Sequence, residues 1–206
     1  MTATSTHRTG IPQTVTPPPR AVRKQRARQR LLQAATDLLL TDGYTVTSID
    51  QIAEHAGYAR SGFFAHFDHL QQIGHDVADR LTRHAIRRIG CFQPRDRDQL
   101  VTTLTRWASI LITKPGWIRL ELDLAALDPA SRAQVIWRLN QLRDEVNHLL
   151  TSSTDLPDPS IDLDHKISYL LSMIVGMATQ HTGDLHASRA PSRDKIELVL
   201  RTAGIA

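Results

Sequence analysis

The segment from Tyr58 to Phe67 holds the side chains of this sequence that are best suited to recognise another molecule. It begins with polar or small residues, among them Arg60, Ser61 and Gly62, which are unusual choices for a helix that only fills a core. An arginine can form a bidentate pair with a carboxylate, a phosphate or a guanine edge, and a serine hydroxyl can donate or accept a hydrogen bond beside it. We therefore expect the outer face of this segment to contact a partner outside the chain.

Reactive side chains elsewhere do not form a catalytic or metal-binding pattern. The pairs His66 with His69 and His181 with His186 lack a third ligand at the spacing of a metal site. The acidic stretch 155–164 lacks the central glycine and the terminal glutamate of a calcium loop. No Ser-His-Asp or Cys-His order stands in a recognisable turn, and no glycine-rich phosphate loop occurs. We therefore expect a protein that is not an enzyme and that uses neither a metal nor a cofactor.

Helical periodicity predicts two helices before the segment from Tyr58 to Phe67. A first helix from Arg23 has an apolar face and ends at Gly43, which suits a left-handed C-terminal cap. Thr47 with Asp50 predicts a capping box at the start of a short second helix. Gly57 then supplies a tight turn.

The third helix is expected from about residue 59 to Phe67, with Phe63 and Phe67 buried at i, i+4 spacing. A turn at Asp68-His69 precedes a fourth helix from Leu70 to about Gly90. The apolar residues of this fourth helix recur every four positions at Ile73, Val77, Leu81 and Ala85.

The remainder of the chain is also helical by its apolar period. Five further helices are expected, and their apolar residues are Leu100, Leu104, Trp107 and Leu111; Trp117, Leu120, Leu124 and Leu127; Val135, Leu139, Leu142, Val146 and Leu149; the nearly all-apolar run 167–181; and Ile196, Val199 and Leu200 in 192–202. No alternating run bounded by turns predicts a sheet. The sequence therefore predicts an all-α fold of about nine helices.

Positive charge is concentrated in the N-terminal half. Residues 1–100 carry 14 Lys/Arg and 9 Asp/Glu, whereas residues 101–206 carry 11 and 12. Residues 1–20 are rich in Thr, Ser and Pro and are expected to form a disordered arm. Before the first acid, the cationic residues are Arg8, Arg20, Arg23, Lys24, Arg26, Arg28 and Arg30. Such a region suits a phosphate backbone or an anionic membrane surface, and a tail that only aids solubility is equally compatible.

Composition favours a soluble protein of the reduced cytoplasm. The chain is 41% hydrophobic, enough to form a core. Cys91 is the single cysteine, so no internal disulfide can form. The longest nearly apolar run, 169–178, is far short of the roughly 20 residues that span a bilayer, and we expect no membrane partner.

Two short helices joined at Gly57 and braced by a preceding helix suggest a helix-turn-helix, whose second helix lies in the major groove of DNA. The small side chains of Ala59, Ser61 and Gly62 would let the backbone approach the bases closely. Arg60 is the candidate for a bidentate contact to guanine.

Residues 26–73 resemble the N-terminal DNA-binding region of the TetR family of bacterial transcription regulators. The matching residues are Gly43-Tyr44, Thr47, Ile52-Ala53, Ala56-Gly57 and His66-Phe67. The resemblance implies that Thr47 contacts a phosphate, that Arg60 and Ser61 contact bases, and that Phe64 and His66 face the DNA backbone. Together with the basic first helix, the expected DNA-binding residues are Lys24, Arg28, Thr47, Tyr58, Arg60, Ser61, Gly62, Phe64 and His66.

The sequence departs from the family pattern at four positions. Phe64 lacks a phenol hydroxyl, Ala59 replaces a polar helix cap, Gly62 replaces a common threonine, and Leu70 stands where a phosphate-binding lysine is frequent. The basic arm from Arg20 to Arg30 is expected to compensate by following the adjacent minor groove.

The resemblance also implies a second domain that binds a ligand and forms a homodimer. We divide the chain into the arm 1–20, a DNA-binding domain 21–70 and a ligand-binding and dimerisation domain 71–206. Candidate ligand residues, for which core packing is the alternative, are His84, Trp107, Leu111, Trp117, Glu121, Trp137, Met173 and Met177. Candidate dimer residues are Leu170, Ile174, Met177, Ile196, Val199 and Leu200, whose apolar helices would leave a large exposed patch on a monomer.

The expected function is sequence-specific transcriptional regulation by a dimer. The dimer would repress from a pseudo-palindromic operator and would be released by a small apolar or amphipathic ligand. Two alternatives remain, which are a DNA-binding regulator without a ligand switch and an all-helical carrier of hydrophobic molecules.

Overall fold

The structure is a computed structural model that describes residues 19–92, 96, 98–100, 102–104, 106, 115–151, 172, 194, 198, 201 and 202. In these residues every regular element is a helix, which confirms the predicted all-α class. The helices are α1 (Arg20–Thr41), α2 (Ile49–His55), α3 (Arg60–Phe64), α4 (Leu70–Gly90), α6 (Pro115–Leu127) and α7 (Pro129–Thr151). The eighth and ninth helices that the sequence predicts lie outside the described residues, apart from Ser172, Asp194, Leu198, Arg201 and Thr202.

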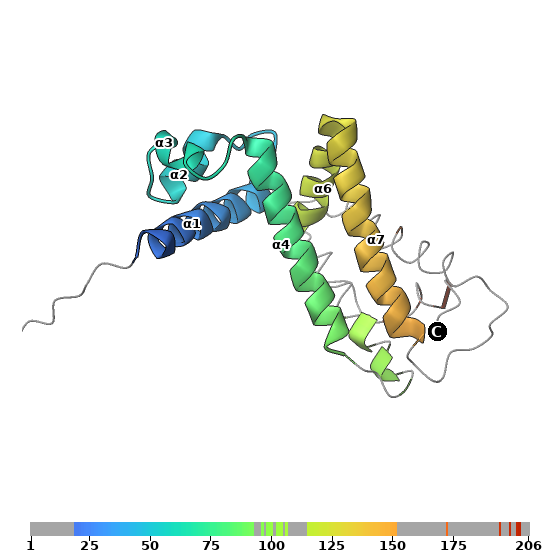
Figure 1. Cartoon of the computed structure of the whole chain (residues 1–206). Helices are drawn as coiled ribbons and strands as arrows, with labels where there is room; N and C mark the ends of the chain where they lie inside the picture. The colour runs from blue at the N-terminus through green and yellow to red at the C-terminus, as the bar shows by residue number, and fades with distance from the viewer. Residues whose placement is uncertain are drawn as a thin grey trace, which may run out of the picture.

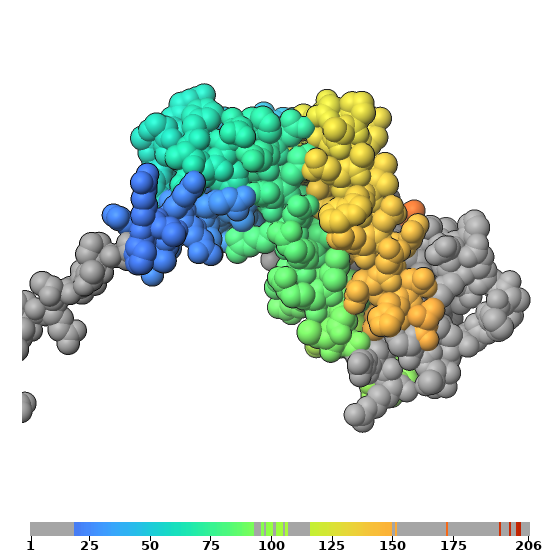
Figure 2. All heavy atoms as spheres, in the orientation of Figure 1, coloured from blue at the N-terminus to red at the C-terminus, as the bar shows by residue number. Residues whose placement is uncertain are grey.

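Helices α1, α2 and α3 form a small bundle at the N-terminal end of α4, and α6 and α7 lie along the other side of α4 (Figure 1). The C-terminal end of α1 reaches α6, and α7 packs along α4. In the space-filling view the α1–α3 bundle projects away from the α6–α7 pair (Figure 2). Helix α4 therefore links the two parts of the molecule. None of the helices in the described ranges is long and apolar enough to cross a membrane.

Helix α1 begins earlier than the sequence suggested. It follows Pro19 and starts at Arg20, three residues before the predicted start. The basic residues from Arg20 to Arg30 therefore all lie on helical turns, whereas only those from Arg23 onward were expected to be helical. The physical reason is that arginine, lysine, glutamine and alanine all favour helix, and no glycine or proline interrupts them after Pro19. The expected disordered residues 1–18 lie outside the described part of the chain.

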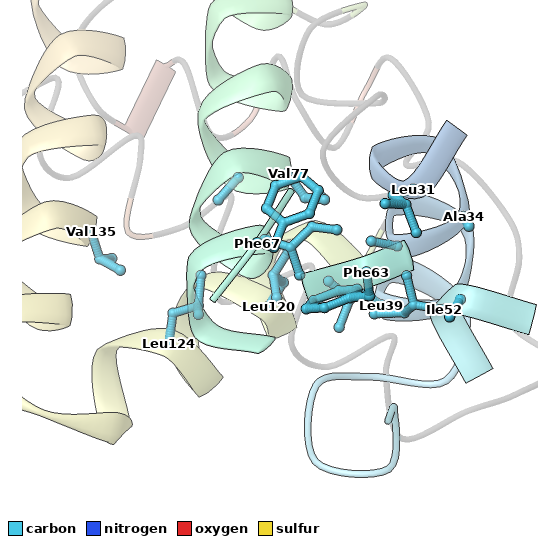
Figure 3. Packing of buried hydrophobic residues seen from close by; sticks show 14 residues of the cluster. Leu31, Ala34, Leu39, Ile52, Phe63, Phe67, Val77, Leu120, Leu124 and Val135 are labelled. Carbon is cyan, nitrogen blue, oxygen red and sulfur yellow. The ribbon is translucent and has the colours of Figure 1, made fainter. Parts of the chain in front are cut away.

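One apolar cluster holds the bundle together and extends into α6. It contains Phe63 and Phe67, both almost fully buried, and Leu120 and Leu124 of α6, which are completely buried. The labelled side chains gather around Phe63 and Phe67 from several helices, and Val135 lies at the edge of the group (Figure 3). The other buried members are Leu31, Ala34, Ala35, Leu39, Ile52, Ala53, Ile73, Val77, Ala78 and Val135. The predicted inner faces of the first four helices are thereby confirmed, with Leu81 partly buried.

The apolar stripe of α7 differs in part from its prediction. Val135, Leu142, Val146 and Leu149 are buried as expected, but Leu139 is 44% exposed. Ser131 and Arg138 are also buried on this side of α7, so the buried side faces away from Leu139. Leu127, predicted on the inner face of α6, is likewise largely exposed at the last position of that helix.

The start of α6 lies directly against the end of α1. A methyl group at Gly116 would come within 2.0 Å of the Leu40 carbonyl oxygen, so only glycine fits there. Next to this contact, Arg119 donates to the Thr41 carbonyl oxygen at 3.1 Å. Gly43, which follows the end of α1 and has a φ of 100°, lies against that guanidinium. This close approach brings the α1–α3 bundle against α6.

Substitution of Gly116 should test this contact. We expect Gly116→Ala to lower the free energy of unfolding by about 1–3 kcal/mol, the usual cost of overpacking, because the obstructing atoms belong to backbone. Urea denaturation measures the change. Gly90→Ala is the control, since the added methyl there meets only the end of the Glu145 side chain. Equal stability of both variants would contradict the close approach.

Candidate nucleic-acid interface

Helix α2 is capped one residue later than predicted. Ser48 is the N-cap: its hydroxyl accepts from the Gln51 backbone N–H at 3.2 Å, and the Gln51 side chain accepts from the Ser48 N–H at 2.8 Å. Thr47 is instead buried and donates its hydroxyl to the Gly43 carbonyl oxygen at 2.6 Å. The predicted Thr47–Asp50 capping box is therefore wrong, because the Thr47 hydroxyl already closes the preceding turn. The exposed hydroxyl at this helix start belongs to Ser48.

The turn between α2 and α3 is made by Gly57, whose φ is 76°. Ala56 ends α2, and the Tyr58 N–H donates across the turn to the Ala53 carbonyl oxygen at 2.8 Å. A φ of this sign is favourable for glycine and costly for other residues, which explains its position in the sequence. The predicted helix-turn-helix arrangement is thus present.

Helix α3 is shorter than predicted. It ends at Phe64, whereas we expected it to reach Phe67. The turn after α3 still brings the Phe67 N–H within 3.0 Å of the Phe63 carbonyl oxygen, and the two buried rings contact each other at 5.5 Å between centroids. These rings fix the inner side of α3, so its outer side is held in a defined orientation.

The outer side of α3 carries Arg60, Ser61 and Phe64, all of which are exposed. Phe64 is 45% exposed although it is a large aromatic residue. Tyr58 is half-buried against the apolar cluster. A methyl group at Gly62 would lie 3.0 Å from the Tyr58 Cβ atom, so internal packing gives a reason for glycine besides the groove contact that the sequence suggested.

Arg60 is not free on this surface. Its guanidinium pairs with the Asp50 carboxylate of α2 at 2.5 Å and lies 5.4 Å from the centroid of the Phe64 ring. Both partners limit the rotamers of a long side chain, and both remain exposed, so the pair can separate without opening the core. The arrangement presents a partly pre-oriented guanidinium on the outer face of α3.

A second cationic group lies between α1 and the turn after α3. It consists of Lys24, Arg28 and His66, and Arg28 also pairs with Asp76 and lies 4.8 Å from the Phe67 ring centroid. Burial, with the charges of Lys24 and Arg28, lowers the pKa of the His66 imidazole. Its Nδ1 atom is buried and has no hydrogen-bond partner in the described part of the chain. The site favours an anion, because an anion would offset these neighbouring positive charges.

Four of the predicted ligand residues lie in the described part of the chain, and of these Trp117 and Glu121 are in contact. His84 is exposed on α4, and Trp137 is 57% exposed on α7, so neither lines an interior cavity. Trp117 is buried, and its indole N–H donates to Glu121 at 3.3 Å. Glu121 is neutralised by the buried Arg138 and is not an unpaired group that awaits a ligand. The remaining candidates, Trp107, Leu111, Met173 and Met177, and the dimer residues Leu170, Ile174, Ile196, Val199 and Leu200, lie outside the described residues.

The described residues of α4, α7 and the stretch 103–106 line a small hollow. The hollow of about 30 Å³ has an apolar floor that includes Ile89, Leu104, Val146 and Leu149, with Arg88 and Arg106 also in its lining. This volume holds one or two water molecules and is far below the roughly 150 Å³ in which benzene binds. Within the same ranges, no three His, Cys, Asp or Glu side chains are grouped to hold a metal. His69, considered above as a metal ligand, caps α4 by accepting from the Gln72 N–H at 3.1 Å.

Two residues of the interface were missed by the sequence analysis. Ser48 was passed over because Thr47 also matches a capping pattern, and only its burial separates the two. Asp50 was assigned to a cap, although its carboxylate in fact holds Arg60. Asp50 and Arg60 are ten residues apart, and this spacing alone predicts no contact, because their contact depends on the angle between α2 and α3.

A model of the family described as bacterial regulatory proteins, tetR family, matches residues 31–71, which contain α2, α3 and the second half of α1. No protein in a comparison with curated sequences matches the chain.

Solved structures share the fold over most of both chains. A TetR family transcription regulator from Marinobacter aquaeolei is 16% identical, with a TM-score of 0.61 over 89% of this chain and 96% of that one. The regulator FadR from Bacillus subtilis, in complex with stearoyl-CoA, is 16% identical, with a TM-score of 0.67 over 86% and 99%. A transcriptional regulator from Saccharomonospora viridis in complex with choline is 18% identical, with a TM-score of 0.69 over 86% and 95%. At these identities the likeness concerns the fold.

The position of the α2 cap can be tested by single substitutions. Ser48→Ala should lower the free energy of unfolding by about 0.5–2 kcal/mol, because two exchanged hydrogen bonds at the helix start are lost. Thr45→Ala, at an exposed position in the same turn, should change it by no more than about 0.5 kcal/mol. Chemical denaturation measures both, and an unchanged Ser48→Ala variant would be evidence against this cap.

Proposed function

Because the chain belongs to the TetR family of bacterial regulatory proteins, we propose that it represses transcription as a two-fold dimer whose α3 helices enter the major groove of an operator. Regulation of transcription through DNA binding is the activity of this family. The finer features proposed for this chain are its DNA contacts, its operator geometry and its response to a ligand.

The observation that carries the proposal is the pair Arg60 and Ser61, exposed on a helix whose other side is locked into the core. Phe63 anchors α3 from within, so the outer face does not need Arg60 or Ser61 for packing. A guanidinium in this position suits the O6 and N7 atoms of guanine. In the free protein Asp50 accepts from Arg60, and a guanine edge would compete with that carboxylate for the same donors.

Phosphate contacts are proposed for the residues around α3. Lys24, Arg28 and His66 form a cationic group beside the recognition helix, and a DNA strand that passes α3 would supply its counter-charge. Ser48 presents an exposed hydroxyl at the start of α2, the role that the sequence analysis gave to Thr47. The helical basic residues Arg20 to Arg30 would then meet the backbone from the side of α1.

The operator follows from the proposed symmetry. A two-fold dimer presents two α3 helices, which match half-sites one helical turn, about 34–36 Å, apart, and the operator is therefore pseudo-palindromic. The apolar sequence of residues 167–181 and 192–202 supports a dimer contact made by the C-terminal helices.

A small apolar or amphipathic effector is proposed to release the dimer. Structures with this fold hold stearoyl-CoA in one case and choline in another, so the fold accepts chemically different ligands. Release requires only that the effector binds more tightly to a state in which the two α3 helices no longer match the operator. Helix α4 would transmit the change, because it contacts α1, α6 and α7.

A regulator without a ligand switch is the second candidate. It is supported by the pairing of Glu121 with Arg138, since this carboxylate is already neutralised within the protein and is not held ready for a ligand. Titration of the DNA complex with candidate effectors distinguishes the two candidates, because only the first releases DNA.

Selection from random duplexes followed by binding titration tests the function itself. We expect the selected sequence to be bound at least about 10³-fold more tightly than random DNA of equal length at physiological salt. Equal affinity for both duplexes would refute specific operator binding.

Substitution of Arg60 should separate base contacts from phosphate contacts. Arg60→Ala is expected to cost about 1–3 kcal/mol on the selected duplex and to relax the preference at one base pair of each half-site. Lys24→Ala should weaken all duplexes and reduce the slope of log K against log salt by about 0.9 per lost contact. Arg83→Ala, exposed on α4 away from the interface, is the control. Loss of affinity without any change in base preference for Arg60→Ala would contradict its assignment.

DNA binding should also depend on pH through His66. Its pKa lies below the ordinary value in the free protein, and a bound phosphate would raise it, so binding takes up a proton. Affinity should therefore increase as the pH falls through the bound-state pKa and level off below the free-state pKa. Calorimetry in buffers of different ionisation enthalpy measures the number of protons taken up on binding. The prediction fails if His66→Gln, which has no titrating ring, shows the same proton uptake.

A further inference from the structure

A continuous polar network joins α4, α6 and α7 just below the α1–α3 bundle. Helix α4 contributes three side chains to it, α6 contributes one and α7 two, and one residue lies between α6 and α7. These residues are Gln71, His75, Asp79, Glu121, Asp128, Ser131 and Arg138.

Arg138 is the centre of the network and is only 1% exposed. Its Nε atom lies 3.0 and 3.1 Å from the two Glu121 carboxylate oxygens, and its Nη2 atom lies 2.6 Å from Oε2. Its Nη1 atom donates to Asp79 Oδ1 at 3.1 Å and lies 3.3 Å from His75 Nδ1. A single guanidinium on α7 therefore holds one carboxylate of α6 and two groups of α4.

The hydrogen bonds of the network run in one direction. A guanidinium can only donate, so His75 Nδ1 must be the acceptor and the ring proton must be on Nε2. His75 Nε2 then donates to Ser131 Oγ at 2.9 Å, and Ser131 Oγ donates to Asp128 Oδ2 at 3.2 Å. Gln71, in the first turn of α4, donates to both Asp128 and Ser131 at 2.7 and 2.6 Å. The first three turns of α4 are thus tied to α7 by bonds with a fixed polarity.

The charges around His75 are consistent with a neutral ring. Burial and then Arg138 lower its pKa, and the carboxylates of Asp79, Asp128 and Asp76 oppose them. The Asp128 carboxylate is itself kept ionised, because the Ser131 N–H, first among several donors, lowers its pKa. His75 therefore stays neutral and Asp128 stays ionised, as the direction of the hydrogen bonds between them requires.

Stability alone does not explain a buried ion pair at this place. Replacing such a pair with apolar residues of similar volume is often neutral or stabilising, because the desolvation cost offsets the attraction. The neighbouring buried positions of α7 are Val135 and Leu142, so an apolar side chain would suit the stripe. Apolar contacts tolerate small rotations and shifts of one helix on another, whereas a bidentate pair with several further bonds does not.

The position of α4 matters because α3 is joined to it by a short turn. Phe67 is fixed in the core, and α4 starts at Leu70, only three residues later. A tilt of α4 relative to α6 and α7 would therefore carry the α1–α3 bundle with it.

We propose that Arg138 is a positioning residue that, through Glu121, Asp79 and His75, fixes α4 against α6 and α7 and so sets the separation of the two recognition helices in the dimer. The part that concerns DNA rests on the function proposed above. The part that concerns α4 rests only on the network.

The test uses a variant that removes the polar network while keeping the core filled. Arg138→Met combined with Glu121→Leu replaces the ion pair with apolar side chains and leaves no unpaired buried charge between α6 and α7. Arg138→Lys keeps the charge and loses the planar fork, and it is used as well in case the double variant does not fold. Arg143→Met, on the same helix but paired only with its neighbour Asp144 in the described contacts, is the matched control.

The first readout needs no DNA. Spin labels at Glu54 of α2 and Asn140 of α7, both exposed, report the distance between the bundle and α7 in full-length protein with Cys91→Ser. We expect one narrow distance distribution for the parent and for Arg143→Met, and a broadened or shifted one for the Arg138 variants, while cooperative thermal unfolding is retained. A distribution as narrow as that of the parent, at the same distance, would overturn the proposal.

The second readout is the spacing preference on DNA. One inserted base pair moves a half-site by about 3.4 Å along the axis, and the parent should lose about tenfold or more in affinity. The Arg138 variants should lose less than about threefold, because their α3 helices can adopt several separations. An unchanged spacing preference would contradict the proposed role in the dimer. If no duplex is bound by the parent, the proposed function fails, and the distance measurement still decides whether Arg138 positions α4.

Discussion

The burial of Phe63 and Phe67 is the constraint on which the rest of this structure depends. Both rings insert among side chains of α1, α2 and α4, and the same cluster continues to Leu120 and Leu124 of α6. An exposed guanidinium can act as a specific probe only if the helix that carries it cannot rotate, and these rings prevent rotation of α3. Because α6 shares the cluster, the orientation of the α1–α3 bundle is also coupled to the helices beyond α4.

Apolar and polar contacts together hold α4 in position. The apolar cluster supplies most of the favourable burial but tolerates small shifts, as core packing generally does when volume is kept. The polar network around Arg138 adds direction, since each of its bonds has one donor and one acceptor. The contact of Gly116 with the Leu40 carbonyl then limits how far α6 can move toward α1. A ligand that disturbs the Arg138 network or the Gly116–Leu40 contact would therefore change the position of α3.

Features that repeat locally could be predicted from the sequence, whereas contacts that depend on the angles between helices could not. The limits of α4, the buried phenylalanines and the turn at Gly57 follow from periodicity and glycine chemistry, and they were predicted. The contact between Glu121 and Arg138 could not be predicted, because the two residues lie 17 positions apart on different helices. Trp137, a candidate for the ligand site or for core packing, is exposed, because the buried stripe of α7 faces away from it. The same limitation hid Asp50 as the partner of Arg60, since nothing in the spacing of those two residues fixes the crossing of α2 and α3.

The most direct test of the central claim is dimethyl sulfate interference on a duplex selected by the full-length protein. Methylation of guanine N7 modifies the edge that faces the major groove, so it blocks a guanidinium bound there. The account predicts interference at guanines in two half-sites one helical turn apart, and loss of that pattern with Arg60→Ala. Binding that tolerates methylation of every major-groove guanine, or an interference pattern unchanged by the loss of Arg60, would contradict it.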